Sequence, residues 1–346
     1  MLGSSRGGTP ADLYWLNAKV LEIGRDRFNS AAIAGGDIRL FHDCVPWGQL
    51  MASLVKRGLS IQWAAAAVRL HRCPNVFLEL DGHASEPMHR RRALFTGAAS
   101  AATLARLPVE DAILEVFDTM WRQEWGFELQ SGRLWVTAWA DNLYTYAGTK
   151  EAAVAQMRAL EKVLKERWHC YVKDDSRTLQ VSANANAEPE PWYDDQVTEW
   201  TLQSHLQTLG PIVSATGGPA ADLTACEKQI WGQFYANVGT LRNPHIPLAK
   251  RVRRLDTFAH GIIAARACLW PPEQATYKQI DRLQNDCIGT MLGWQHNPDD
   301  TPQQNSINRN RAIGQVPRVQ WSYVAARAAI SWAGHLLPRT QAATTE

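Results

Sequence analysis

The sequence predicts an α+β fold, in which an antiparallel sheet with supporting helices precedes an all-helical C-terminal region. Between residues 134 and 148, two runs rich in aromatic and β-branched residues flank Asp141 and Asn142, a pattern that predicts a hairpin. Apolar residues at helical spacing in 109–125 and 149–168 predict helices that support the sheet. From residue 221 onward the pattern becomes helical, in 227–241, 247–269, 273–292 and 319–336.

The length and composition predict a globular chain with more than one compact part. The 346 residues can form a large core, divided into two domains or into one domain with a helical extension. A content of 45% hydrophobic and 20% charged residues excludes general disorder. The formal net charge of +2 is close to neutral, so a nucleic-acid partner would require local basic patches.

The cysteines and the hydropathy pattern predict the compartment. The six cysteines are scattered and form no Cys-x-x-Cys pair, which argues against a zinc finger and favours reduced thiols. The Gly- and Ser-rich start does not resemble a signal peptide. No stretch approaches the roughly 20 apolar residues of a membrane helix. We therefore expect no membrane partner and a soluble, intracellular protein, in the nucleus or the cytoplasm.

Two acidic positions are candidates for metal binding. Asp141 lies at the tip of the predicted hairpin, where a carboxylate is held rigidly and still reaches solvent, as an Mg²⁺ ligand must. The same pair of residues also fits a plain hairpin turn. Asp37 lies in a short apolar segment, six residues before Asp43. Taken alone, Asp37 also fits a solvated loop acid.

Two motifs resemble reverse transcriptases. The stretch from Trp139 to Leu143 resembles the aromatic-Ala-Asp-Asp box of these enzymes. The stretch from Asp37 to Trp47 resembles the first metal-binding box of LINE-type (non-LTR) retrotransposon reverse transcriptases, with Asp37 and Asp43 to Trp47 in register. A terminal Trp-Ala-Gly-His, at 332–335, is similar to the string that closes many chains of this family. The resemblance covers roughly residues 30 to 336.

The resemblance implies a domain organisation. Residues 1–30 would be an N-terminal segment, a remnant of the fingers, so that the chain would be an N-terminally truncated member of the family. Residues 31–218 would form the polymerase palm, an antiparallel sheet with supporting helices. Residues 219–346 would form a helical thumb and C-terminal region. Complete members also carry an endonuclease domain, and we expect the 36 residues before Asp37 to be too few to contain one.

The resemblance also implies an activity and its cofactors. The chain would be an RNA-directed DNA polymerase that extends a DNA primer on an RNA template with dNTPs. Two Mg²⁺ ions, or Mn²⁺ in their place, would be held by Asp37 and Asp141. Asn142 would complete the catalytic group. The positions that correspond to nucleotide-binding residues are His42, Gly97 and Lys173.

Departures from the family pattern leave two functional hypotheses. Asn142 replaces the second aspartate of the box and removes one charge, His42 replaces the aromatic residue that selects the sugar, and only Gly97 and Ser100 remain of the second box. We expect either a polymerase with impaired or lost activity, or a non-catalytic nucleic-acid-binding remnant. A third hypothesis, an unrelated helical interaction protein, predicts that Asp37 and Asp141 lie far apart.

Two basic clusters are candidates for nucleic-acid binding, since Lys and Arg pair with phosphate. Each also fits a solvated charged surface. The clusters are Arg90, Arg91 and Arg92 in the first half, and Lys250, Arg251, Arg253 and Arg254 in the second.

Local patterns give further expectations near the sheet. The stretch 168–181 predicts a strand, a turn at 174–176 and a second strand. The polar stretch 182–195 predicts a loop. In the helix expected over 109–125, the residues expected to face the core are Ile113, Val116, Phe117 and Met120.

Overall fold

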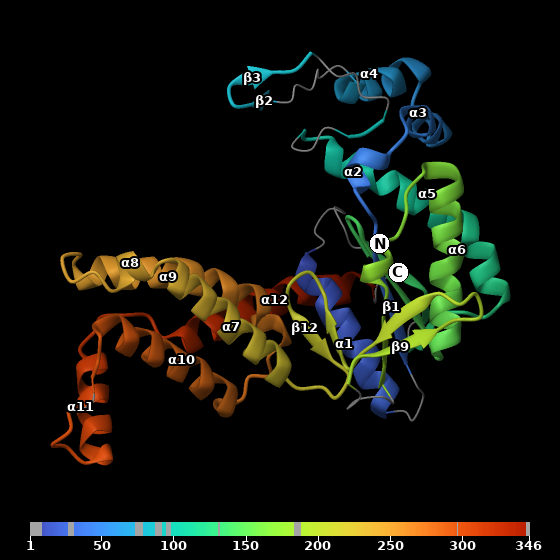
Figure 1. Ribbon diagram of the computed structural model, residues 1–346. Helices are drawn as coiled ribbons and strands as arrows, with labels where there is room; N and C mark the ends of the chain where they lie inside the picture. The colour runs from blue at the N-terminus through green and yellow to red at the C-terminus, as the bar shows by residue number, and fades with distance from the viewer. Residues whose placement is uncertain are drawn as a thin grey trace. The chain divides into compact units, whose positions relative to one another are not determined.

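The protein has a mixed α/β architecture in two compact units (Figure 1). The computed structural model describes residues 9–26, 31–72, 79–86, 92–94, 98–130, 132–182, 188–295 and 297–343, with side chains of the last helix to residue 335. The units are Met1–Leu206 and Gln207–Glu346. Each has its own core of buried apolar side chains.

The first unit is built on a six-stranded sheet in the order β6-β7-β1-β8-β10-β9. Strand β1 pairs antiparallel with both β7 and β8. Strand β10 is parallel to β8 and antiparallel to β9. The strands are β1 (Ala32–Asp37), β6 (Val136–Trp139), β7 (Asn142–Ala147), β8 (Thr178–Val181), β9 (Glu190–Tyr193) and β10 (Glu199–Leu202).

Small residues let β1 lie deep in this unit. Its first five residues are buried, and Asp37 is its last residue. A Cβ atom on Gly35 would come within 2.8 Å of Thr178 Oγ1, and one on Gly36 within 2.8 Å of Val172 Cγ1. Larger residues at these positions would push the neighbouring segments away from the strand. Asp37 therefore ends a buried strand and does not lie in a solvated loop, the alternative that the sequence left open.

Helices cover both faces of the sheet. Successive residues of a strand point to opposite faces, and on β7 Thr145 Oγ1 donates to Ala153 O of α6 (Lys150–Trp168) at 2.7 Å. Its neighbour Tyr146 donates from its hydroxyl to Asn17 Oδ1 of α1 (Pro10–Asp26) at 2.6 Å. Helix α6 begins at the Thr149 cap, whose side chain accepts from Ala152 N. Helix α5 (Ala101–Arg122) packs against α6 (Figure 1).

The segment between β1 and β6 is mostly helical. It contains α2 (Phe41–Cys44), α3 (Trp47–Lys56), α4 (Ile61–Arg72), β2 (Glu79–Leu80), β3 (His83–Ala84), α5, β4 (Phe127–Leu129) and β5 (Gly132–Leu134). Helix α5 starts eight residues before the predicted 109, because the preceding Ala-rich stretch continues it through the buried Pro108. Val116 and Met120 are buried as expected, whereas Phe117 is 40% exposed.

One local expectation was wrong in this unit, and a second was confirmed only in part. Within the stretch predicted as a loop, 190–193 form strand β9, which tolerates Pro191 because it is an edge strand. In 168–181, the expected turn at 174–176 and the second strand, β8, are present, but the first strand is reduced to a single bridge. Val172 bridges Ile38, and β8 pairs with β1, with a 3₁₀ turn (Asp174–Ser176) between them. Strand β9 pairs with the nearby β10, whereas Val172 and β8 pair with the distant segment 32–38, which local patterns do not encode.

The second unit is helical. A short hairpin of β11 (His205–Gln207) and β12 (Ile212–Ser214) lies at the division. The helices are α7 (Ala220–Ala236), α8 (Val238–Leu241), α9 (Leu248–Arg266), a 3₁₀ turn (Ala267–Leu269), α10 (Gln274–Leu292), α11 (Pro302–Gly314) and α12 (Trp321–Ala343). Helix α11 was missed, although the Thr301 cap and Pro302 at its first position are standard start signals. Across the described ranges, every helix is too short or too polar to span a membrane.

A buried ion pair lies in the core of the second unit. Asp222, 2% exposed, pairs with Arg266, 6% exposed. Asp222 Oδ2 also accepts from Trp270 Nε1 at 2.9 Å, and Asp222 Oδ1 accepts from Ile212 N at 2.8 Å. A single carboxylate thus joins α7, α9, the turn after α9 and β12, and its removal would leave a buried guanidinium without its charge partner.

We predict that Asp222→Ala lowers the free energy of unfolding by about 3–5 kcal/mol, the usual cost of breaking a buried pair on one side. Urea unfolding followed by circular dichroism measures this. The control is Asp286→Ala, because the Asp286–Arg309 pair of the same unit is partly exposed at 39% and 33%. We expect a loss of about 1 kcal/mol or less for the control. Equal losses in the two variants would contradict the assigned role.

Candidate functional site

Two acidic residues meet at one end of the sheet. Asp37, the last residue of β1, is the register partner of Asn142, the first residue of β7. Asp141 precedes it in the β6–β7 turn, which begins at Ala140 with a positive φ of 50°. The backbone N–H of Ile38 donates to Asp141 O at 2.8 Å. The antiparallel pairing of β1 with β7 therefore brings Asp37 and Asp141 side by side across more than a hundred residues of sequence.

A lysine joins this acid pair. Lys173 Nζ donates to Asp37 Oδ2 at 2.6 Å, and Lys173 N donates to Asp37 O at 2.9 Å. Ser176 supports the contact, since its hydroxyl accepts from Asp37 N at 2.9 Å and donates to Lys173 O at 2.8 Å. Ser176 was not among the predicted site residues, although it lies in the predicted turn at 174–176. The 3₁₀ turn thus holds Lys173 beside Asp37.

The acid pair carries an electrostatic conflict. Burial raises the pKa of the Asp141 carboxyl group, and the negative charge of Asp37 raises it further. The Lys173 cation opposes this effect only in part. Its own pKa is raised, chiefly because it donates a hydrogen bond to Asp37. Asn142 contributes a donor to the site, from Nδ2 to Asp141 Oδ1 at 3.3 Å.

The donor set fits a divalent cation that takes further ligands from its substrate. Asp37 Oδ1 is buried and accepts no hydrogen bond from any described residue, so one anionic oxygen is available. A cation between the carboxylates would also relieve their repulsion. Among the described residues no group of three or more His, Cys, Asp or Glu side chains could hold a metal ion. Mg²⁺ commonly binds through one or two carboxylates, with water and phosphate oxygens as the other ligands.

The other predicted nucleotide-binding positions lie apart from this contact network. Phe41 is 3% exposed, and its ring meets the half-buried His42 ring edge-on at 5.8 Å. His42 O accepts from Leu94 N at 2.6 Å. Between described residues, no hydrogen bond or ion pair joins the His42 side chain to Asp37 or Asp141. Gly97 lies outside the described residues, as do Arg90 and Arg91 of the first basic cluster.

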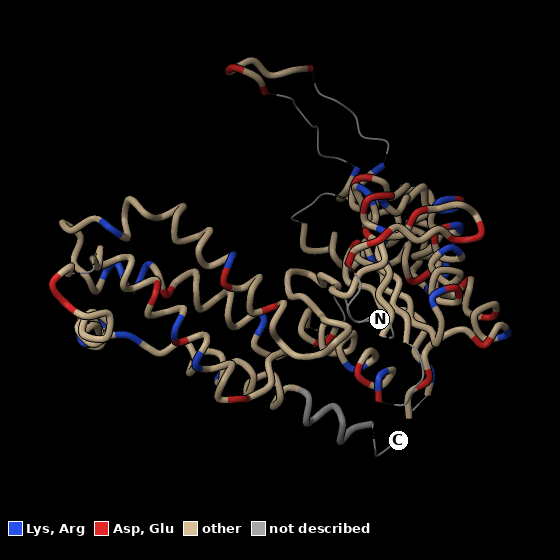
Figure 2. Tube along the Cα trace, turned by 60° about the horizontal axis from the view of Figure 1, so that its bottom comes forward, with Lys and Arg blue, Asp and Glu red and all other residues tan. Residues whose placement is uncertain are grey.

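The second basic cluster is divided in its roles. Arg251 Nη1 donates to Leu241 O at 3.2 Å and to Met291 O at 3.3 Å, so it holds the ends of α8 and α10. Arg254 donates twice to Asn237 Oδ1, at 3.2 and 2.9 Å. Within the described chain, Lys250 and Arg253 make no side-chain hydrogen bond or ion pair, and they are available to a phosphate. Along the coloured part of the trace, Lys and Arg are interspersed with Asp and Glu (Figure 2).

Comparison with solved structures shows distant similarity to telomerases. No protein-family model and no curated protein matches the sequence. The structure is similar to telomerase from Candida albicans in complex with a TWJ fragment of telomeric RNA, at a TM-score of 0.42 and 9% identity over 92% of this chain and 53% of that one. It is also similar to the corresponding Candida tropicalis complex, at a TM-score of 0.41 and 9% identity over 89% and 52%.

This chain spans about half the length of those telomerases. A similarity this low assigns no activity to the chain. Its function has to be argued from the acid pair and its neighbours.

The raised pKa of Asp141 predicts a pH-dependent stability. The folded state holds the Asp141 proton more tightly than the unfolded state, so proton binding at Asp141 stabilises the fold. This contribution is full at acidic pH and is lost as the pH rises through the pKa of Asp141 in the folded state. We predict that Asp141→Asn has a higher Tm than the wild type at pH 7.5 and that the difference shrinks toward pH 4. Scanning calorimetry at both pH values measures this.

The control for this experiment is Asp118→Asn, which removes an exposed carboxylate of α5 in the same unit. We expect no change in Tm for the control at either pH. Two results would contradict the assigned repulsion. One is that Asp141→Asn has no higher Tm than the wild type at pH 7.5, and the other is that the Tm difference grows as the pH falls.

Proposed function

We propose that this chain is a nucleotidyltransferase of the reverse-transcriptase type, which extends a DNA primer on an RNA template with dNTPs. The observation that supports this most directly is the Asp37–Asp141 pair at the ends of two neighbouring antiparallel strands, with Lys173 against it. Two carboxylates beside one lysine combine cation-binding groups with a phosphate-binding group. The proposed LINE-type origin rests on the motifs at 37–47, 139–143 and 332–335.

Each residue has a distinct role in this proposal. Asp37 and Asp141 supply anionic oxygens for divalent cations, Mg²⁺ or Mn²⁺. When bound, such cations supply charge neutralisation at the nucleotide phosphates and lower the pKa of the primer 3′-hydroxyl group. Lys173, which now pairs with Asp37, can instead pair with a nucleotide phosphate. Ser176 holds Lys173 within reach of both Asp37 and the nucleotide phosphate. Asn142 orients the Asp141 carboxylate.

Specific observations favour a second candidate, a nucleic-acid-binding protein without catalysis. Asn142 lacks the charge of the aspartate that it replaces, so the site is less anionic than the family pattern implies. Lys173 already neutralises Asp37 at 2.6 Å, which competes with a cation for the same carboxylate. In this case the chain would bind a primer–template duplex through basic residues such as Lys250 and Arg253 and would not extend it.

Primer extension on an RNA template with Mg²⁺ tests the first candidate. We predict incorporation by the wild type and a loss of at least about 100-fold in Asp141→Ala, because charge stabilisation by a bound cation contributes several kcal/mol and each 1.4 kcal/mol is about tenfold in rate. Asp118→Ala, at the exposed surface of α5, serves as the control and should retain full incorporation.

The possible outcomes separate the candidates. Equal incorporation by the wild type and Asp141→Ala would reject the assigned site. No incorporation by the wild type, together with retention of an RNA–DNA duplex in a gel-shift assay without divalent ions, would favour the second candidate. Absence of both extension and duplex binding would reject both.

A further inference from the structure

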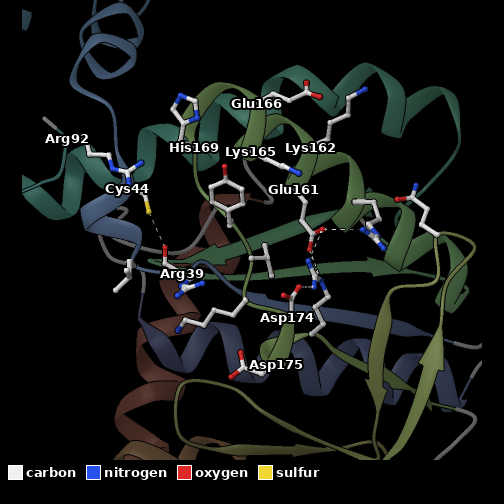
Figure 3. Close-up of a pocket in the computed structure, with 17 residues that line it drawn as sticks. Arg39, Cys44, Arg92, Glu161, Lys162, Lys165, Glu166, His169, Asp174 and Asp175 are labelled. Atoms are coloured by element: carbon white, nitrogen blue, oxygen red, sulfur yellow. Dashed lines mark hydrogen bonds and ion pairs between the residues drawn. The ribbon is translucent and has the colours of Figure 1, made fainter.

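A large open cleft lies beside the acid pair in the first unit (Figure 3). Its volume is 1240 Å³, and its walls come from the start of α2, the outer face of α6, the segment 169–177 and isolated positions such as Arg92. Lys173 lines the cleft and also contacts Asp37, so the cleft opens next to the acid pair. Charged side chains make up most of its lining.

Part of this charge is already neutralised within the protein. Arg158 binds Asp194 Oδ2 through two hydrogen bonds of 2.8 and 2.6 Å. Arg177 pairs with Glu161 at 3.1 Å and also with Asp174. These contacts join α6 to the segments that follow it. They form a fixed wall and leave little charge for a ligand.

The remaining charge of the cleft is positive. Four lining cations make no ion pair with any described residue, namely Arg39, Arg92, Lys162 and Lys165. Only two lining acids are similarly without an ion pair in the described chain, Glu166 and Asp175. Unpaired cations around a hollow attract an anion, and low-dielectric walls strengthen this attraction.

The positions of these cations indicate the kind of anion. Lys162 and Lys165 are three residues apart, on one face of α6. Arg39 follows β1, and Arg92 comes from a third segment; both lie to one side of Lys162 and Lys165 (Figure 3). One phosphate group is too small to contact all of them. The cleft is also larger than the roughly 300–1,000 Å³ typical of pockets for a single small ligand.

We infer that this cleft binds a chain of linked phosphates, with Lys162 and Lys165 on one side and Arg39 and Arg92 on the other. Two sources share this chemistry, a free polyphosphate and the backbone of a single-stranded polynucleotide. Binding here requires neither Asp37 nor Asp141. The inference adds a binding site to those of the proposed function and does not depend on nucleotidyl transfer.

Isothermal titration calorimetry of the full chain with inorganic tripolyphosphate, in buffer without divalent ions, tests the inference. We expect binding by the wild type and an affinity about tenfold lower in the double variant Lys162→Gln/Lys165→Gln, which keeps helix-forming side chains on α6. The matched control is Arg69→Gln/Arg122→Gln, which removes two exposed cations of the same unit that do not line the cleft. The control should stay within about twofold of the wild type.

A single-stranded dT10 oligonucleotide identifies the source. If the polynucleotide is the ligand, dT10 competes with tripolyphosphate. The slope of the logarithm of the dT10 affinity against the logarithm of the salt concentration then falls in magnitude by about 1.4 in the Lys162→Gln/Lys165→Gln variant, because each lost phosphate contact contributes about 0.7. If free polyphosphate is the ligand, tripolyphosphate binds and dT10 does not compete. Either result supports the phosphate-chain site.

Two outcomes would overturn the inference. One is that the wild type binds neither probe, and the other is that the cleft and control variants lose affinity equally. The far-ultraviolet circular dichroism spectrum of each variant shows that it is folded. Asp141→Ala should keep its tripolyphosphate affinity even if it abolishes primer extension, so failure of the nucleotidyltransferase proposal and failure of this inference give different results.

Discussion

The register between β1 and β7 is the constraint on which the site depends. Because Asp37 lies opposite Asn142, the carboxylate that ends one strand meets the acid that precedes the next. A slip of one residue would turn every side chain of β1 to the other face and separate the pair. Buried small residues on β1 hold this register, since Gly35 and Gly36 have no room for a Cβ atom beside Thr178 and Val172.

The acid pair is stabilised by an internal cation and destabilised by its own repulsion. Lys173 neutralises Asp37, while burial and Asp37 together disfavour the charged form of Asp141. A folded chain accepts such repulsion at a cost in stability, which is typical of sites built for a charged ligand. Asn142 reduces that cost because an amide carries no charge. An amide at position 142 therefore adds no further repulsion to the hairpin tip.

Local patterns in the sequence predicted where helices and strands form better than they predicted which strands pair. The β6–β7 hairpin with Asp141 at its tip follows from aromatic and β-branched runs around two turn residues. The sequence could not reveal that β8 pairs with β1, because pairing depends on burial and on distant strands. The Arg251 side chain shows a similar limit. It looks like one charge in a basic run, but only the packing of α8 and α10 reveals that it holds their carbonyl groups.

Helix α6 connects the acid pair to the charged cleft. Its buried face carries Val154, Met157, Leu160 and Val163 and packs against the sheet that positions Asp37 and Asp141. Its outer face carries Lys162 and Lys165 into the cleft. The helical spacing of its apolar residues places them on one face of α6 and the lysines on the other. One helix therefore fixes the distance between a carboxylate site and a cationic one, so a phosphorylated ligand long enough to reach both would be oriented by the fold itself.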